Sequence, residues 1–201
     1  STLEDYINIV KICDTLGNID IQSHISCEPN DVDVNIRHNV MVYNTLKYSD
    51  KPLMGTCYGY EYSKQSIEMA AIAFGGMSEI KDKPGITTMP CTLTPLGYDD
   101  NMAGGIMAFA EYGQPQLINA LSMAGLTTPT TLVGLVSLQN AEVLAGIVLA
   151  QCVNPGCPVV SSASGSIADM ATCNPAPAPP AVALISPTTR QLTKASTLPS
   201  P

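Results

Sequence analysis

"TLVGLVSLQNAEVLAGIVLAQCVNPGCPVV", residues 131–160, is nearly free of charge and ends in a short apolar run. Residues 132–153 would form a helix about 33 Å long, at about 1.5 Å per residue, which is enough to cross a bilayer. Glu142 would then lie near the bilayer centre, where an acidic residue costs roughly 2.5–3.5 kcal/mol. The stretch therefore favours a helix packed inside a larger fold, followed by a buried strand that begins at "CPVV".

Gln139, Glu142 and Gly146 follow one another at spacings of three and four residues, so they share one face of this helix. A buried amide and a buried carboxylate need hydrogen-bond partners. We expect Gln139 and Glu142 to have a structural role, in which they satisfy neighbouring loop N–H groups or helix ends. We also expect Gly146 to let another backbone approach closely. The alternative, in which this face contacts a ligand or a partner, stays open.

Helix-like and strand-like segments alternate along the rest of the chain. Thr2 and Asp5 form a capping box that opens the first helix, and Ser63 is the expected N-cap of a later one. The expected helices span residues 2–17, 30–50, 63–76, 98–113 and 132–153, and the expected strands span 18–26, 51–59, 85–95, 114–125 and 157–165. This alternation predicts an α/β fold in which helices cover a parallel sheet.

The alternation amounts to five to six βα units in 201 residues. No strand-like segment leads into a glycine-rich nucleotide-binding fingerprint, which disfavours a doubly wound nucleotide-binding fold. A (β/α)8 barrel fits the order better, but a complete barrel needs about 250 residues. We therefore predict an incomplete TIM-type (β/α)8 barrel. Residues 1–201 would be one domain and a fragment of a larger barrel, with a divergent, proline-rich tail at 174–201.

The charge balance excludes two classes of partner. Charged residues make up only 13% of the chain, and the net charge is −8. Nucleic acids and anionic membrane surfaces both require basic patches, so neither is an expected partner. A chain with so few charges has few polar side chains to cover its surface, so we expect part of that surface to be buried in a homo-oligomer. The seven scattered cysteines, without a secretory signal, indicate reduced thiols in the cytoplasm.

Metal ligands and acid–base pairs are scarce. The pair His24 and Cys27, and the pair Cys152 and Cys157, are spaced too loosely for an ordinary zinc site, so no bound metal is expected. His38, which follows a basic residue inside a helix, is expected at the surface rather than in catalysis. No residue is identified as catalytic.

The expected strand ends carry hydroxyls, small residues, tyrosines and methionines. In a (β/α)8 barrel the site forms at the carboxyl ends of the strands. The side chains expected to bind substrate there are Tyr58, Tyr60, Thr94, Ser122, Met123, Ser162 and Ser164. Such a rim suits a small organic ligand with few hydrogen bonds, and tyrosine rings attract a quaternary ammonium through the cation–π interaction.

Three segments carry a resemblance to a known family. They are "DKPLMGTCYG" (residues 50–59), the stretch from "TPLGYDDNMAGG" to "SSASGSIADM" (94–170), and "ALIS…TRQL" (183–192). The most specific part is "LQNAEVLAGIVLAQ", residues 138–151. The chain resembles the trimethylamine methyltransferase family, the corrinoid-protein-dependent methyltransferases that include glycine betaine methyltransferase. The departure from the family pattern is the proline cluster between Cys173 and Pro187.

The resemblance implies a TIM-type barrel that moves a methyl group from a methylamine or quaternary amine, trimethylamine or a betaine, to cobalt. In that barrel the polar face with Gln139 and Glu142 would brace the strand-end loops after residues 122 and 161. The corrinoid (cobalamin) would be carried by a cognate corrinoid protein and not bound by this chain directly. Trimethylamine members of the family use pyrrolysine, expected after Pro201, so the choice between trimethylamine and a betaine stays open.

Two other hypotheses stay open. One is a non-catalytic small-molecule-binding barrel fragment. The other is a different barrel enzyme, such as an aldolase or a phosphate-binding isomerase. That enzyme would need a strand-end lysine or a glycine-rich phosphate loop, and the sequence contains neither at the expected positions.

Overall fold

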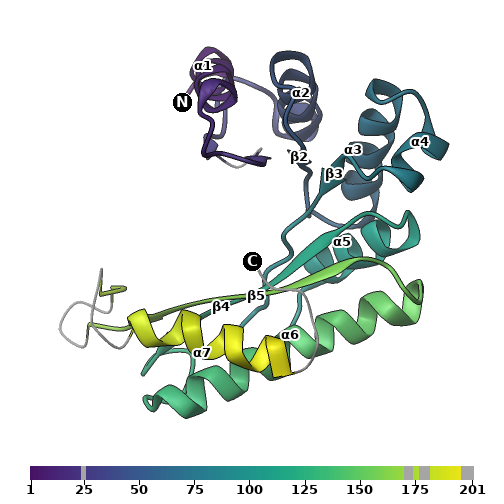
Figure 1. Ribbon diagram of the computed structural model, residues 1–201. Coiled ribbons are helices and arrows are strands. Elements are labelled where there is room, and N and C mark those ends of the chain that lie inside the picture. The colour runs from purple at the N-terminus through teal and green to yellow at the C-terminus, as the bar shows by residue number, and fades with distance from the viewer. Residues whose placement is uncertain (24–25, 170–173, 177–181, 196–201) are drawn as a thin grey trace.

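The computed structural model describes residues 1–23, 26–169, 174–176 and 182–195 (Figure 1). These residues form seven helices and five strands. The helices are α1 (Leu3–Thr15), α2 (Val34–Tyr48), α3 (Tyr60–Ala73), α4 (Met77–Asp82), α5 (Asp100–Glu111), α6 (Leu132–Val153) and α7 (Val182–Ala195). The strands are β1 (Gln22–Ser23), β2 (Leu53–Met54), β3 (Ile86–Thr87), β4 (Gln116–Ala124) and β5 (Val159–Ile167).

All five strands run parallel, which confirms the predicted α/β class. β1, β2 and β3 form one sheet in that order, and β4 pairs with β5 over nine residues. Two isolated parallel bridges, Thr88 with Gln116 and Cys91 with Asn119, join the chain after β3 to β4. Strand neighbours therefore follow chain order from β1 to β5, without the reversal that marks a doubly wound sheet.

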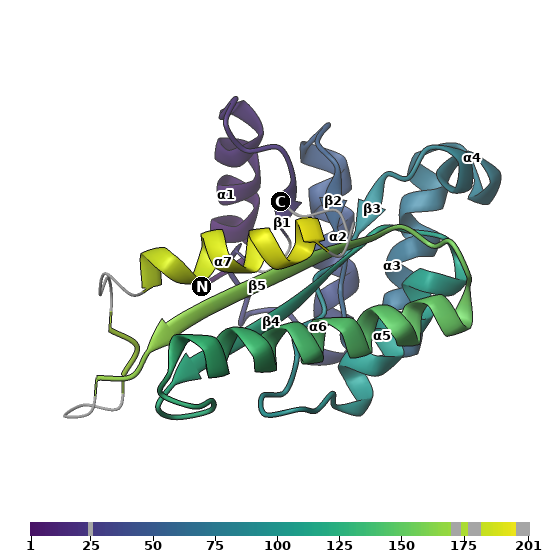
Figure 2. The same cartoon turned by 60° about the horizontal axis from the view of Figure 1, so that its bottom comes forward.

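The helices lie on one side of the strands. In Figure 1 the chain follows an arc from α1 through α3 and α5 to α6, with the strands along its inner side. Figure 2 shows α6 and α7 lying along β4 and β5. Since side chains alternate along a strand, one side of each strand faces the helices and the other faces the inside of the arc.

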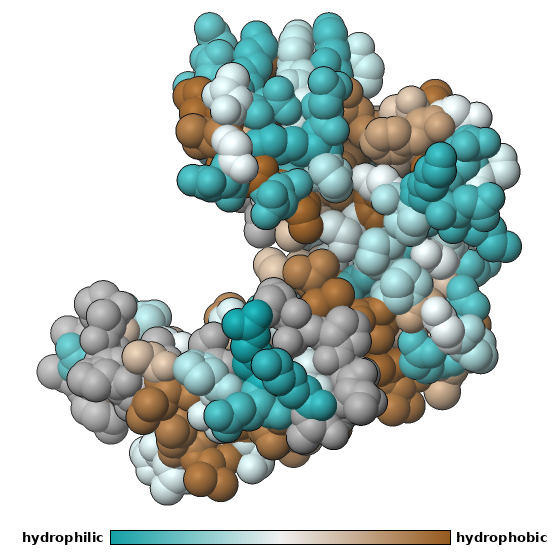
Figure 3. Space-filling model, in the orientation of Figure 1, coloured by the Kyte–Doolittle hydropathy of each residue, from teal (hydrophilic) through white to brown (hydrophobic). Residues whose placement is uncertain are grey.

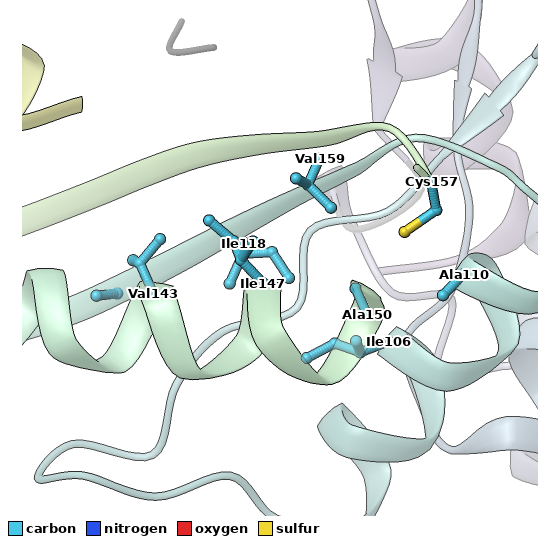
Figure 4. Packing of buried hydrophobic residues seen from close by; sticks show 9 residues of the cluster. Ile106, Ala110, Ile118, Val143, Ile147, Ala150, Cys157 and Val159 are labelled. Atoms are coloured by element: carbon cyan, nitrogen blue, oxygen red, sulfur yellow. The ribbon is translucent and has the colours of Figure 1, made fainter. Parts of the chain in front are cut away.

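The helix-facing side of the sheet holds the apolar core. Ile118 of β4 packs against Val143 and Ile147 of α6, and Ile106 of α5 joins the same cluster (Figure 4). A second cluster places Leu53 and Ile86 of the short strands against α2, α3, α4 and Phe109 of α5. The two clusters meet at α5, so the core runs continuously behind the strands.

Two local expectations are tested directly. The capping box at Thr2 and Asp5 is confirmed. The N-cap expected at Ser63 is wrong, because α3 begins at Tyr60 and Gly59 precedes it with φ 90° and ψ 171°. Ser63 lies one turn inside the helix, and its hydroxyl donates to the Thr56 carbonyl oxygen at 3.1 Å. Glycine starts this helix because few other residues adopt such a φ.

The third strand is shorter than the sequence pattern indicated. It ends at Thr87, whereas the pattern extended it to residue 95. Pro90 lacks the N–H that a strand needs for continued pairing, so the chain makes only isolated bridges beyond Thr87. Residues 88–98 consequently form a long connection at the carboxyl end of β3.

Helix α6 is, among the described residues, the one helix long and apolar enough to cross a membrane. In this structure one of its faces is covered by β4, β5 and α5. Leu135, Val136, Val143 and Ile147 are buried there, whereas Val133 and Val148 on the other face are exposed. The helix therefore packs into the fold in the way that its polar residues indicated.

The proline-rich tail expected at 174–201 is described in part. Helix α7 forms within it, with Pro187 inside the helix. Ile185 is buried against the cluster formed by Ala124, Leu135 and Val136. Gly165 of β5 lies so close to Ile185 that a Cβ at that position would come within 3.0 Å of its Cδ1 atom. The tail thus supplies the cover for the helix-facing side of β5.

Candidate functional site

The carboxyl ends of β2 and β3 open into a cavity of about 160 Å³. Residues that follow the two strands line it, together with one residue of the first turn of α5. The lining residues are Met54, Gly55, Cys57, Tyr58, Thr88, Met89, Cys91 and Met102. Five of these eight residues contain sulfur, and none carries a formal charge. The cavity therefore offers a soft, weakly polar surface at the edge where α/β proteins bind ligands.

Two cysteines of the cavity differ in environment. Cys57 is buried, and burial raises the pKa of its thiol to about 12. Its sulfur packs against Gly105 of α5, where a Cβ atom would collide with it. Cys91 is half-buried, and its thiol donates to the Met89 carbonyl oxygen at 3.9 Å. Because Cys57 remains protonated at neutral pH, it is a poor nucleophile.

Cys91, Asn119 and Ser162 lie at one level on three neighbouring segments of the sheet. The pairing register joins Cys91 to Asn119 and Asn119 to Ser162. The Asn119 amide nitrogen donates to the Cys91 sulfur at 3.6 Å. Asn119 is only 5% exposed, and its amide oxygen has no hydrogen-bond partner among the described residues. The Asn119 amide oxygen is therefore a buried hydrogen-bond acceptor without a donor in the described part of the chain, and Asn119 lies next to the cavity residue Cys91.

Met123, Ser162 and Ser164 occupy the same side of their strands as Asn119. The register pairs Asn119 with Ser162 and Leu121 with Ser164. The alternate residues, such as Ile118, face α6 instead. These three residues of the sequence-derived set therefore face the inside of the arc. Figure 3 shows that the molecule is hollowed there and that apolar side chains gather beside the hollow.

Ser122 lies on the opposite side of β4. It is 3% exposed, and its hydroxyl has no hydrogen-bond partner among the described residues. Its neighbours two residues away, Ala120 and Ala124, belong to the core clusters beside α6. The structure thus separates Ser122 from Met123, Ser162 and Ser164.

Tyr58 and Tyr60 also lie apart. Tyr58 lines the sulfur-rich cavity, and its hydroxyl donates to Glu28 at 3.5 Å. Tyr60 is the first residue of α3, and its hydroxyl donates to the Glu111 carboxylate of α5 at 2.5 Å. This hydrogen bond raises the pKa of Tyr60 to about 12. Tyr60 therefore links two helices, whereas Tyr58 reaches the cavity.

Thr94 belongs to a network centred on Glu142. The Glu142 carboxylate accepts hydrogen bonds from the Thr92 hydroxyl at 2.8 Å, the Thr94 hydroxyl at 3.0 Å and the Leu96 N–H at 2.7 Å. Glu142 is 2% exposed. Tyr98 donates to the Glu142 carbonyl oxygen at 2.9 Å and packs on Gly146. Helix α6 therefore holds the long connection after β3 through one buried carboxylate.

Gln139 makes the corresponding contact with β5. Its amide nitrogen donates to the Ser164 carbonyl oxygen at 2.9 Å. The sequence placed this polar face against the loops after residues 122 and 161. In the structure, Glu142 contacts residues 92–96 and Gln139 contacts β5 itself. Gly146 admits the Tyr98 side chain, not another backbone.

A second cavity, of about 260 Å³, lies beside the first and shares Tyr58 with it. It is lined by Glu28, Val34, Asn35, Arg37, His38, Met41, Tyr58 and Tyr62. His38, which we expected at the surface, is 7% exposed, with its Nε2 atom 3.0 Å from the Gln65 amide oxygen and its ring against Tyr62. The helix pairing of α2 with α3 buries it, and sequence spacing does not reveal that pairing.

No cluster of three or more His, Cys, Asp or Glu side chains suited to a metal ion occurs within the described ranges. His24, considered with Cys27, lies outside those ranges. The six cysteines that the structure describes are all free.

Sequence reasoning missed Met54, Met89, Cys91 and Asn119. The pattern ran β3 to residue 95, which placed Met89 and Cys91 inside a strand. Pro90 was the available signal for an earlier strand end. Asn119 lacked any such signal, because a polar residue within an apolar strand is noticed only when its neighbours are known.

The family model described as trimethylamine methyltransferase (MTTB) matches residues 1–200. The chain belongs to this family of methyltransferases.

Three curated relatives show which members of the family this chain is similar to. The chain is 46% identical over 170 residues to glycine betaine methyltransferase of Desulfitobacterium hafniense (strain Y51), covering 85% of this chain and 36% of that protein. It is 34% identical over 174 residues to proline betaine:corrinoid methyltransferase of Eubacterium limosum, covering 83% and 36%. It is 29% identical over 204 residues to a trimethylamine methyltransferase of Desulfitobacterium hafniense (strain DSM 10664 / DCB-2), covering 100% and 40%. The chain spans little more than a third of the length of these relatives.

Proposed function

We propose that the whole protein transfers a methyl group from a methylated amine, trimethylamine or a betaine, to the cobalt of a cognate corrinoid protein. The observation that carries this proposal is the family match over residues 1–200 together with relatives named as betaine and trimethylamine methyltransferases. Two relatives at 34% and 30% identity are named as corrinoid methyltransferases. Greater similarity to the glycine betaine enzyme than to the trimethylamine enzyme favours a betaine.

We further propose that β1 to β5 are part of a closed (β/α)8 barrel. Parallel strands in chain order, with helices on one side only, are the arrangement that such a barrel requires. The outer edges of β1 and β5 have no strand partner among the described residues. Since the relatives are more than twice as long, the remaining units would come from the rest of the protein.

The chain's own residues would bind and orient the amine and exclude water from it. The proposed substrate contacts are Tyr58 and three side chains that face the inside of the arc, Met123, Ser162 and Ser164. Thr94, which Glu142 holds in the connection after β3, is a further proposed contact. Gln139 and Glu142 would act structurally, because the Glu142 carboxylate is engaged by the connection after β3 and the Gln139 amide nitrogen by β5. Positioning a reacting methyl group in line with its acceptor lowers the barrier without any acid or base.

The corrinoid on the partner would supply the cobalt nucleophile. Exposed leucines at the carboxyl edge fit a partner of this kind. Leu93, Leu96 and Leu126 lie in the connections after β3 and β4, and they are 62%, 69% and 56% exposed. An apolar rim around a weakly polar cavity suits the flat face of a large ring and the protein that carries it. We also propose a cytoplasmic homo-oligomer, in keeping with the free cysteines and the low charge.

Methyl transfer to added cob(I)alamin tests the function. The whole protein should form methylcobalamin with glycine betaine or trimethylamine as the donor. A non-catalytic binding barrel, the other hypothesis, would bind an amine in calorimetry yet form no methylcobalamin. Absence of methylcobalamin with both donors and with the cognate corrinoid protein would therefore reject the proposal.

A further inference from the structure

The cavity at the carboxyl ends of β2 and β3 has an unusual composition. The sulfur-containing residues Met54, Cys57, Met89, Cys91 and Met102 make up five of its eight lining residues, and Tyr58 is another. Its volume of about 160 Å³ exceeds the space taken by a single water, about 30 Å³. The cavity therefore has room for a small organic group and offers it polarizable, uncharged walls.

We propose that this sulfur-lined cavity holds the N-methyl groups of a betaine and selects this zwitterion over protonated trimethylamine. The inference rests on the proposed methyl-transfer function. It adds the location of the methylated nitrogen and the residues that set the choice of substrate.

A quaternary nitrogen suits these walls because it carries no N–H. Its positive charge is spread over methyl groups, which need close contact and not a hydrogen-bond acceptor. Methionine and cysteine sulfur are soft and polarizable, and a tyrosine ring attracts a quaternary ammonium. The cavity provides both kinds of surface around one space.

Protonated trimethylamine fits less well for two reasons. Its N–H would enter a cavity whose eight lining residues include no carboxylate, so the donor would lack a strong partner. It is also a net cation, and transfer of a net charge into an uncharged site is costly. A betaine carries its own carboxylate and is neutral overall, so its ammonium end can enter while the carboxylate remains at the open side.

Cys57 keeps its part of the wall neutral. Burial raises the pKa of Cys57 to about 12, so this thiol is uncharged at neutral pH. Cys91 is hydrogen bonded to the Met89 carbonyl oxygen and to Asn119. A thiolate at either position would attract a cation and would compete for the methyl group as a nucleophile.

A reversal of substrate preference tests the inference. Methyl transfer by the whole protein is measured with glycine betaine and with trimethylamine, and the two kcat/KM values are compared as a ratio. Cys91→Asp supplies an acceptor and a negative charge in the cavity, so the betaine-to-trimethylamine ratio should fall at least tenfold. The matched control is Cys152→Asp, on the exposed face of α6, which should keep the wild-type ratio.

Met102→Gln is a milder second variant, since it adds an amide oxygen without a charge, and a threefold fall in the ratio is expected. Met102→Leu keeps the volume without sulfur, so the KM for glycine betaine should rise while kcat changes little. Wild-type ratios in both Cys91→Asp and Met102→Gln would overturn the inference.

Calorimetric binding of glycine betaine separates this inference from the proposed function. A tenfold change in the dissociation constant of glycine betaine in Cys91→Asp, with no change in Cys152→Asp, would support the cavity even if wild-type protein formed no methylcobalamin. Equal binding in wild type and Cys91→Asp would place the methylated nitrogen elsewhere, whatever the activity.

Discussion

The Glu142 carboxylate and the Thr92 hydroxyl, 50 residues apart in the chain, form a buried hydrogen bond of 2.8 Å. The same carboxylate also accepts the Thr94 hydroxyl and the Leu96 N–H. One side chain of α6 thereby satisfies three donors of the connection that follows β3. That connection begins at the sulfur-lined cavity, so the stability of the cavity wall depends on a residue outside it.

Replacement of Glu142 by Leu should destabilise the protein and lower its soluble yield more than it changes substrate choice. The change leaves up to three donors without their acceptor, at a cost of roughly 3 kcal/mol or more. Glu142→Gln, which keeps an acceptor oxygen, should recover part of the loss. Chemical denaturation measures the stability. Unchanged folding of Glu142→Leu together with lost substrate binding would favour a direct ligand contact instead.

Gly146→Ala, a change in α6, should also destabilise the contact between α6 and the connection after β3. A Cβ atom at this position would collide with the Tyr98 hydroxyl and with Ile118. Tyr98 would have to leave the Glu142 carbonyl oxygen, and overpacking of this kind costs about 1–3 kcal/mol. Gly17→Ala is the control, because a Cβ there meets nothing within 4 Å. A thermal melt in which both variants behave alike would show that Tyr98 is not seated on Gly146.

Gly59→Ala should destabilise the start of α3. Gly59 has φ 90° and ψ 171°, a conformation that is essentially restricted to glycine. Forcing alanine into it costs about 1–3 kcal/mol. Because Gly59 directly follows Tyr58, we expect a weaker interaction with substrate as well as a lower midpoint of unfolding. A variant as stable as wild type would mean that this turn relaxes to an ordinary conformation.

Alkaline pH should weaken the packing of α1 on α2 through Tyr6. Tyr6 is fully buried and shares a 2.6 Å hydrogen bond with Thr45, and burial raises its pKa from 10.0 to about 12. The folded state therefore binds the phenolic proton more tightly than the unfolded state. The resulting stability is fully present below pH 10 and is lost as the pH rises from 10 to 12.

Tyr6→Phe tests this assignment. The variant should cost about 1–2 kcal/mol at neutral pH, because the Tyr6 hydroxyl contacts both Thr45 and the Met41 carbonyl oxygen, while Thr45 keeps its own bond to that oxygen. Its free energy of unfolding should fall less steeply than that of wild type between pH 10 and 12. Urea titrations at several pH values measure this free energy. If it falls equally steeply with pH in wild type and variant, another group causes the alkaline loss of stability.

Residue patterns predicted the order of helices and strands because each pattern depends only on residues close together in the chain. The capping box at Thr2, the apolar run of 132–153 and the alternation of segments each depend on neighbours within a few residues. Local reading went wrong at the start of α3, at the end of β3 and at the end of β2, which stops at Met54 and not at residue 59. At Gly59 the chain needs an unusual φ, and at Pro90 it loses a donor, so both boundaries followed backbone chemistry and not hydrophobic spacing.

The residue set for the site was readable only in part. Placement near a strand end was enough to name Tyr58, but Tyr60, two residues later, turns toward Glu111 on another helix. Met123 and Ser122 are adjacent in the chain, yet they occupy opposite sides of β4 because side chains alternate along a strand. Which side faces the helices depends on where α6 packs, and residue types alone leave that open.

The amino-acid sequence was therefore sufficient for the parallel α/β class, the family and the presence of a weakly charged strand edge, because each follows from composition and short-range pattern. The convergence of Met54, Cys57, Met89, Cys91 and Met102 on one cavity came from folding. These residues belong to three separate segments, and their shared space exists only because β2, β3 and α5 pack side by side. The partners of Glu142 were fixed in the same way, since long-range contacts depend on strand order and helix packing.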